Sequence, residues 1–191
     1  MSNNKNNHNI KIEEISENTI NNSYNQKYIA THDALTDLPN RILLQEHIAS
    51  AIEQACINNH LLAVFFMDLD GFKNINDKAG HAVGDLVLKE TAQRLIRNTR
   101  STDLVARLGG DEFVILLPDT DRAGAEQVLL KLLQGFGQSA HLVDTHVTPS
   151  IGVVCAMDAP SDLEIMIRAA DDLMYDVKAG GRNAIRFKAI G

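Results

Sequence analysis

Two acidic residues follow a pair of glycines in the segment Gly109–Phe113, where the chain first shows residues that could do chemistry. Apolar runs at 104–106 and 114–117 flank it, so the glycines predict a tight β-hairpin turn with positive φ angles. A turn without β-carbons lets a phosphate-bearing ligand approach the backbone closely. Asp111 and Glu112 would then lie at the start of a rigid strand.

A second pair of acids, Asp68 and Asp70, ends the apolar run at 61–67. A continuous apolar run of this length favours a central buried strand. If that strand neighbours the hairpin, Asp68 and Asp111 converge. Carboxylates held together repel each other, so either one pKa rises or a divalent cation neutralises both, and ligands that are all oxygen favour Mg²⁺ or Mn²⁺.

The segment between Asp68 and Asn74 predicts a short connection from a strand to a helix. Backbone amides at such a connection can point at a phosphate, and Lys73 would add a positive charge. An isolated lysine is ordinarily a solvated surface residue, so a role for Lys73 depends on the residues around it.

Composition restricts the classes of function. The chain has 191 residues, 45% of them hydrophobic, with a net charge of −7 and a pI of about 5.4. This balance argues against a binder of nucleic-acid polymers but allows a small nucleotide accompanied by a cation. Cys56 and Cys155 lie in apolar stretches, typical of buried thiols in a reducing compartment. No run reaches the roughly 18 apolar residues of a membrane span, and residues 1–9 lack a signal-peptide core, so we expect a cytoplasmic protein.

The order of elements predicts the fold class. We expect a polar tail and linker helix over 1–30 and one globular domain over 31–191, which opens with a turn near Asp37 and Pro39. Hydrophobic periodicity then predicts a helix at 40–58, a strand at 61–67, one long helix starting irregularly at 74, strands at 104–108 and 112–117, a helix at 125–136, a strand at 147–156, a helix at 165–177 and a strand at 184–187. We therefore predict an α+β sandwich of βαββαβ type, with a mixed, largely antiparallel central sheet flanked by helices.

Several separated blocks of the chain together carry a family resemblance. The chain resembles the GGDEF domain family, the diguanylate cyclases, over roughly residues 31–189. The blocks are 33–41 (DALTDLPNR), 68–77 (DLDGFKNIND), 80–85 (GHAVGD), 107–113 (RLGGDEF), 150–152 (SIG), 170–171 (AD), 174–175 (MY), Lys178 and 181–183 (GRN). The resemblance implies a fold like that of the nucleotidyl cyclases and polymerase palms.

The resemblance also implies roles for individual residues. It assigns two Mg²⁺ or Mn²⁺ ions per active site to Asp68, the Leu69 carbonyl, Asp111 and Glu112. It makes Asp111, Glu112 and Lys178 the catalytic residues, with Asp111 the usual proton acceptor. The substrate-binding residues it implies are Phe72, Lys73, Asn76, His81, Asp85, Lys178 and Arg182. Within that set Asn76 and Asp85 face guanine, because a carboxylate accepts from the N1 and N2 donors that adenine lacks, while the three cations meet phosphates.

The implied reaction is the condensation of two GTP into cyclic di-GMP and two pyrophosphates. The 3′-hydroxyl of one GTP would attack the α-phosphate of the other, and metal ions would stabilise the attacking and leaving oxygens. One domain offers one GTP site, so we expect a homodimer, with a sensor partner possible in trans.

A second site is implied by Arg100 and Asp103, which match the product-inhibition motif Arg-x-x-Asp of the family in their spacing before the hairpin. Arginine can stack on guanine or bind phosphate, and the acid can accept from guanine. The alternative is that Arg100 caps a helix and Asp103 belongs to a turn.

Two alternatives to an active diguanylate cyclase are an inactive receptor for cyclic di-GMP and a cyclase with altered purine choice, which Asp85 argues against.

Met174 and Tyr175 are expected in the core.

Overall fold

The structure is a computed structural model that describes residues 22, 25–48, 61–136, 147–156 and 162–190. Residues 1–21 and 23–24 of the expected tail and linker helix over 1–30, the second half of the expected helix at 40–58, and Cys56 lie outside the described residues. Helical residues 25–31 lead into a turn closed by a bridge between His32 and Pro39, and a helix follows at 41–48. Asp37 has a φ of 61°, which confirms the predicted turn.

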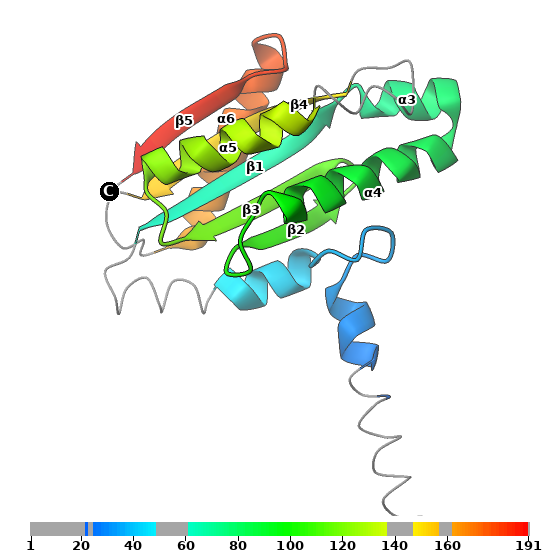
Figure 1. Cartoon of the computed structure of the whole chain (residues 1–191), viewed down its shortest axis with the longest axis horizontal. Coiled ribbons are helices and arrows are strands. Elements are labelled where there is room, and N and C mark those ends of the chain that lie inside the picture. Colours follow the sequence, from blue (N-terminus) through cyan, green and yellow to red (C-terminus); the bar gives the residue numbers. More distant parts are fainter. Residues whose placement is uncertain (1–21, 23–24, 49–60, 137–146, 157–161, 191) are drawn as a thin grey trace, which may run out of the picture.

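One five-stranded sheet forms the centre of the molecule (Figure 1). Its strands are β1 (Leu62–Asp70), β2 (Leu104–Gly109), β3 (Glu112–Pro118), β4 (Thr148–Ala156) and β5 (Ile185–Ile190). Their spatial order is β2-β3-β1-β4-β5, and every neighbouring pair is antiparallel except β4 and β5. The predicted mixed, largely antiparallel sheet is confirmed, and β1 lies between the hairpin and β4.

Four helices follow the strands along the chain: α3 (Phe72–Ala79), α4 (His81–Arg97), α5 (Arg122–Phe136) and α6 (Leu163–Ala179). The prediction of one long helix after β1 was wrong, because the chain breaks it into α3 and α4. Gly80 lies between the two with φ 86° and ψ 161°, a conformation outside the helical region that glycine adopts without strain.

The side chains of β1 alternate between two cores, as expected for a strand that is covered on both faces. Phe65 and Met67 pack on the side of α4 and α5, whereas Val64 and Phe66 pack on the side of α6 and the helix at 41–48. Figure 1 shows α4 and α5 in front of the sheet and α6 behind it. Every residue of β1 is buried, as predicted for the apolar run at 61–67, and the strand continues through Asp68 to Asp70.

Two expectations about buried residues had different outcomes. Cys155 is a buried free thiol, and Met174 is 3% exposed. Tyr175 is 70% exposed, so its expected place in the core was wrong. Successive helix residues differ in direction by about 100°, so a residue next to a core position need not be buried. None of the helices described has the combination of length and hydropathy that a bilayer crossing requires.

Candidate active site

Acidic side chains replace apolar ones at the end of β1 and at the neighbouring start of β3. On β1 the residues that share a face with Phe66 are Asp68 and Asp70, and on β3 the residue that precedes Val114 on that face is Glu112. Asp68 is the direct partner of Glu112 in the antiparallel register. The predicted convergence of the two segments is therefore present, with Glu112 opposite Asp68 and Asp111 one residue nearer the turn.

Lys178 brings a positive charge to this cluster from the last turn of α6. Its Nζ lies 2.6 Å from Oδ2 of Asp68, whose side chain is only 6% exposed, while the Lys178 side chain is 30% exposed. Gly152 on β4 allows this approach, because a β-carbon there would overlap the backbone of α6 at Ala170. The close packing of α6 on β4 thus sets where Lys178 lies.

The environment of the cluster disfavours the ionised forms of Asp68 and Glu112 and raises the pKa of both. Burial raises the pKa of Asp68, Lys178 opposes that rise, and the charges of Asp111 and Asp70 add to it. Burial also raises the pKa of Glu112, and the carboxylates of Asp171, Asp68 and Asp111 add to that rise. Excess negative charge of this kind is the environment that a divalent cation neutralises.

The donor set fits Mg²⁺ or Mn²⁺ bound together with a nucleotide. Over the ranges that the structure describes, no three His, Cys, Asp or Glu side chains form a ready-made metal site. Magnesium, however, is commonly held by one or two carboxylates, with phosphate and water completing the shell. The Leu69 carbonyl suits such a site because the described strands on either side place no N–H opposite Leu69. The residue opposite it on β4 is Pro149, which has no N–H to donate. On the other side, the pairing of β1 with β3 ends at Asp68.

The turn between β2 and β3 has the backbone that its glycines predicted. Gly109 has a φ of 141° and Gly110 a φ of 54°, and the ladder shifts register between Arg107 and Gly109. The buried Arg107 guanidinium donates from Nε and Nη2 to the Gly110 carbonyl at 3.1 and 2.8 Å. Its Nη1 donates to Asp33 Oδ1 at 2.7 Å. One arginine therefore fixes the turn and joins it to the segment that precedes the domain core.

Asp70, two residues beyond Asp68 on the same face, has a structural role. Its carboxylate accepts hydrogen bonds from the hydroxyls of Ser150 at 2.8 Å and Thr148 at 3.0 Å, and from the backbone N–H of Asn183 at 2.9 Å. Arg182 Nε lies 3.9 Å from Asp70 Oδ1. Asp70 thus holds the loop after α6, where Arg182 has a φ of 68°, against the end of β1.

The residues expected to bind nucleotide lie on α3, on α4, at the end of α6 and in the loop that follows it. Phe72, Lys73 and Asn76 belong to α3, and His81 and Asp85 lie four residues apart on α4. Lys73, His81, Asp85 and Arg182 are exposed, whereas Phe72 and Asn76 are half-buried. Lys178 and Arg182 reach Asp68 and Asp70 respectively, so both cations lie along the acidic end of β1.

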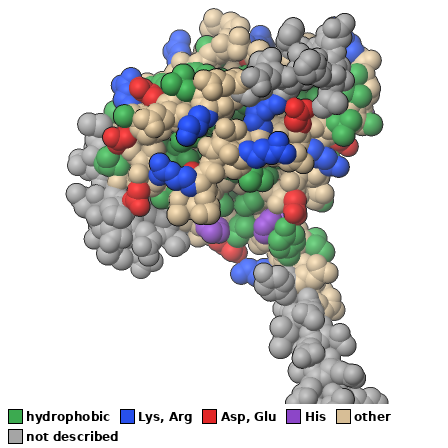
Figure 2. All heavy atoms as spheres, in the orientation of Figure 1, with side chains coloured by type: hydrophobic (Ala, Val, Ile, Leu, Met, Phe, Trp, Pro, Cys, Tyr) green, Lys and Arg blue, Asp and Glu red, His purple; other side chains and the backbone are tan. Residues whose placement is uncertain are grey.

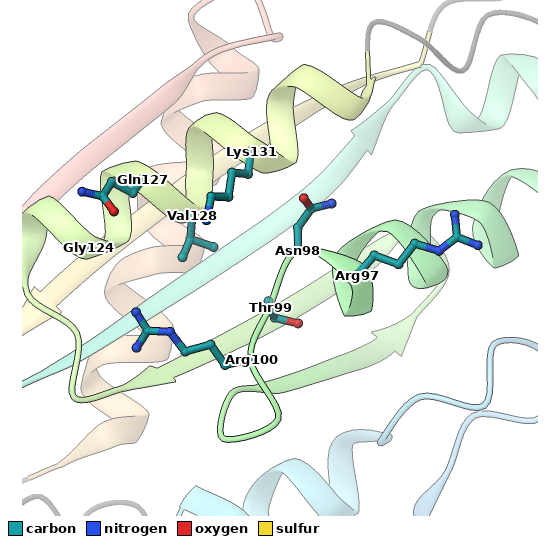
Figure 3. Close-up of a pocket in the computed structure, with 8 residues that line it drawn as sticks. All are labelled: Arg97, Asn98, Thr99, Arg100, Gly124, Gln127, Val128 and Lys131. Atoms are coloured by element: carbon teal, nitrogen blue, oxygen red, sulfur yellow. The ribbon is translucent and has the colours of Figure 1, made fainter.

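A second feature lies on the opposite side of the sheet, between the end of α4 and α5. A cavity of about 220 Å³ is lined by Arg97, Asn98, Thr99, Arg100, Gly124, Gln127, Val128 and Lys131. In Figure 3, Val128 and Lys131 of α5 face Asn98 and Thr99, and Arg97 points outward. Asp103 is outside this lining: its Oδ2 accepts from the Arg100 N–H at 2.6 Å, and its buried Oδ1 has no partner within the described structure.

Comparison with known families decides the classification. Residues 30–184 match the family model described as "Diguanylate cyclase, GGDEF domain". The chain belongs to the GGDEF family. The hairpin at 109–113 is thus the sequence for which the family is named. In this GGDEF domain its Glu112 lies opposite Asp68, which pairs with Lys178.

Three similar proteins illustrate the range of the family. The bifunctional diguanylate cyclase/cyclic di-GMP phosphodiesterase MucR of Pseudomonas aeruginosa is 43% identical over 162 residues, which are 83% of this chain and 24% of MucR. The crystal structure of the diguanylate cyclase SiaD of P. aeruginosa with its activator SiaC has a TM-score of 0.78 at 30% identity, covering 97% of this chain and 72% of SiaD. The GGDEF domain of DgcB from Caulobacter crescentus, in complex with c-di-GMP, has a TM-score of 0.75 at 26% identity, covering 83% and 95%.

Several contacts of this GGDEF domain were not predicted from its sequence. Arg107 and Asp33 are 74 positions apart, and Lys131 reaches the cavity near Arg100 from another helix. Beyond the effect of burial, the carboxylate of Asp171 on α6 raises the pKa of Glu112 on β3. Local spacing carries no signal for such pairs, because only the fold brings their elements together.

Proposed function

We propose that this GGDEF domain is a diguanylate cyclase that condenses two GTP into cyclic di-GMP and two pyrophosphates. The observation that carries the proposal is the cluster of Asp68, Glu112 and Lys178 beside the glycine turn. It combines carboxylates that need a cation with a lysine and a backbone that phosphates can approach. The names of MucR and SiaD support the proposal, although the chain spans only about a quarter of the length of MucR.

The acidic cluster would hold the metal ions of the reaction. Asp68, the Leu69 carbonyl, Asp111 and Glu112 are the ligands we propose for two Mg²⁺ or Mn²⁺ ions, which supply charge neutralisation at the phosphates when bound. Asp111 accepts the proton of the attacking 3′-hydroxyl in this proposal. The new bond joins that O3′ to the α-phosphorus of the other GTP, and the bond to pyrophosphate breaks.

Lys178 has two successive partners in this scheme. In the structure its ammonium group pairs with Asp68. When a triphosphate enters, Lys178 moves to the β and γ phosphates together with Lys73 and Arg182, because these phosphates carry more negative charge than one carboxylate. The pair with Lys178 opposes the rise in the pKa of Asp68 and holds Lys178 close to its proposed working position.

Guanine would be selected by Asp85 and Asn76. The exposed Asp85 carboxylate accepts from the N1 and N2 donors, and the Asn76 amide serves the rest of the edge. Phe72 and His81 lie next to these two residues on α3 and α4 and complete the substrate side of the site. Adenine lacks the paired donors, so GTP is the proposed substrate.

Catalysis would require two domains, because each supplies one GTP to the other. The proposed working form is a homodimer, and an activating partner in trans is consistent with the complex of SiaD with its activator. The site at the end of β1 is open to such an arrangement, since Lys73, Asp85 and Arg182 are all exposed.

The cavity near Arg100 would bind the product as an inhibitor. Three cations line it, and Figure 2 shows Lys and Arg side chains spread over the face that α4 and α5 cover, although the whole chain has a net charge of −7. Arg100 and Asp103 would contact the guanine and phosphate groups of cyclic di-GMP. We expect cyclic di-GMP to slow turnover of the parent and Arg100→Ala to relieve that inhibition. Equal inhibition of both proteins would refute this role.

The same cavity favours a second function, an inactive receptor for cyclic di-GMP. Incubation with GTP and Mg²⁺ followed by chromatography separates the two functions. A cyclase converts GTP into cyclic di-GMP, and Asp111→Asn abolishes the conversion. A sample that is shown to be dimeric and binds cyclic di-GMP, yet forms no product, would favour the receptor.

A further inference from the structure

Asn76 and Gly84 meet where α3 and α4 pack against each other. The chain reverses at Gly80, whose N–H donates to the Asn76 carbonyl at 3.0 Å, and the Gly84 N–H donates to the Gly80 carbonyl at 3.3 Å. These backbone contacts bring the fourth residue of α4 beside the fifth residue of α3. Gly84 is buried and Asn76 is half-buried.

Glycine at position 84 calls for a physical reason, because glycine is among the poorest helix formers. Its neighbours supply one. A β-carbon on Gly84 would overlap Oδ1 of Asn76, would lie 3.0 Å from Asn76 Cγ, and would lie 3.3 Å from Cζ of Phe72. The absent side chain of Gly84 is therefore the space that the Asn76 carboxamide occupies.

The Asn76 carboxamide has no hydrogen-bond partner among the described residues that would orient it. Its backbone is fixed by the bond to Gly80, so the freedom that remains is rotation of the side chain. Contact with the bare backbone of Gly84 restricts that rotation without using any of the donors or acceptors of the amide. The polar edge of Asn76 stays available for a ligand while its direction is set by packing.

We propose that Gly84 is a positioning residue that orients the Asn76 carboxamide toward the guanine edge of bound GTP. The inference rests on the proposed function, since it takes guanine as the ligand of Asn76. Gly84 touches no substrate and acts through Asn76 alone. A β-carbon at position 84 displaces the amide and weakens the binding of guanine nucleotides, while the acidic cluster at Asp68 is untouched.

The test compares Gly84→Ala with the parent in the binding of guanosine 5′-(α,β-methylene)triphosphate, an analogue that cannot lose pyrophosphate. We expect the dissociation constant to rise about tenfold, the effect of one lost hydrogen bond. The KM for GTP rises similarly and kcat stays within about twofold, because guanine is held equally in the ground and transition states. The adenosine analogue binds both proteins equally. Ala82→Ser, which adds one heavy atom at an exposed position in the same turn, leaves all values unchanged.

A second background separates positioning from damage to the fold. In Asn76→Ala, the further change Gly84→Ala should have no effect on analogue binding, since the group that it displaces is gone. A tenfold loss that persists there would place the cause at Phe72 or the helix packing and overturn the inference. Equal binding of the guanosine analogue by Gly84→Ala and the parent would overturn this inference but not the proposed function. A parent that does not prefer the guanosine analogue would overturn the proposed function and this inference together.

Discussion

At the scale of single residues, Asp68 and Asp70 share a strand face but differ in what they touch. Among the described residues the Asp68 carboxylate has one polar side-chain partner, Lys178, whereas the Asp70 carboxylate accepts hydrogen bonds from three donors on β4 and the loop after α6. We expect Asp68→Asn to lower turnover by at least about 100-fold, because a proposed metal ligand is lost, with the fold retained. Asp70→Asn should instead lower the free energy of unfolding by about 1–3 kcal/mol. Turnover assays and urea unfolding measure both, and the reverse pattern would contradict these roles.

Glu112 gives a prediction for pH dependence. Burial and neighbouring carboxylates raise its pKa in the folded state. A carboxyl group whose pKa is raised binds protons more tightly when folded, so its contribution to stability is largest below the ordinary carboxyl pKa and is lost as the pH rises through the raised value. The metal-free protein should therefore lose stability over this window, and Glu112→Gln should flatten the loss. Urea unfolding between about pH 4 and pH 8 tests this, with Glu126→Gln as control, since the Glu126 side chain is 46% exposed. Equal slopes in the parent and Glu112→Gln would refute it.

Single residues also show what the sequence could predict. Asp68 and Asp111 were expected to converge if their strands are neighbours, as the βαββ order favours, and the register confirms that the strands are neighbours. That Glu112 faces Asp68 could not be predicted, since it depends on the register in which β1 pairs with β3. Asp70 resembles Asp68 in sequence, and contacts from β4 and the loop after α6 distinguish their roles.

At the scale of elements, Arg107 joins the β2-β3 turn to the segment before the domain core. Its ion pair with Asp33 is largely buried, with side chains 9% and 23% exposed. We expect a double-mutant cycle of Asp33→Ala and Arg107→Ala to show a coupling of about 1–3 kcal/mol in unfolding free energy. The exposed pair of Arg168 and Glu164 should show less than about 0.5 kcal/mol. A coupling no larger than that of the exposed pair would mean that Arg107 does not join the two elements.

The order and type of most elements could be predicted from the pattern of apolar residues. Helices show apolar residues at helical spacing, and a buried strand such as β1 shows a continuous apolar run. The break between α3 and α4 was missed, since one glycine inside a helical pattern is usually tolerated. Gly80 differs because its positive φ is used to turn the chain, and that angle has no signature in the sequence.

At the scale of the whole molecule, the proposed reaction needs two copies. The βαββ order was enough to predict that β1 neighbours the hairpin, but it says nothing about how two domains meet. We expect the rate of product formation per mole of protein to fall as the protein is diluted, because fewer domains are then paired. A rate per mole that stays constant across the range where size measurements show dissociation would contradict the need for a dimer.

The most direct test of the central claim measures cyclic di-GMP and pyrophosphate in one reaction. With GTP and Mg²⁺, at a protein concentration where the dimer is populated, the account predicts two pyrophosphates for each cyclic di-GMP, and neither product from Asp68→Asn. Unchanged GTP from such a sample, or conversion of GTP to GDP and phosphate, would contradict it.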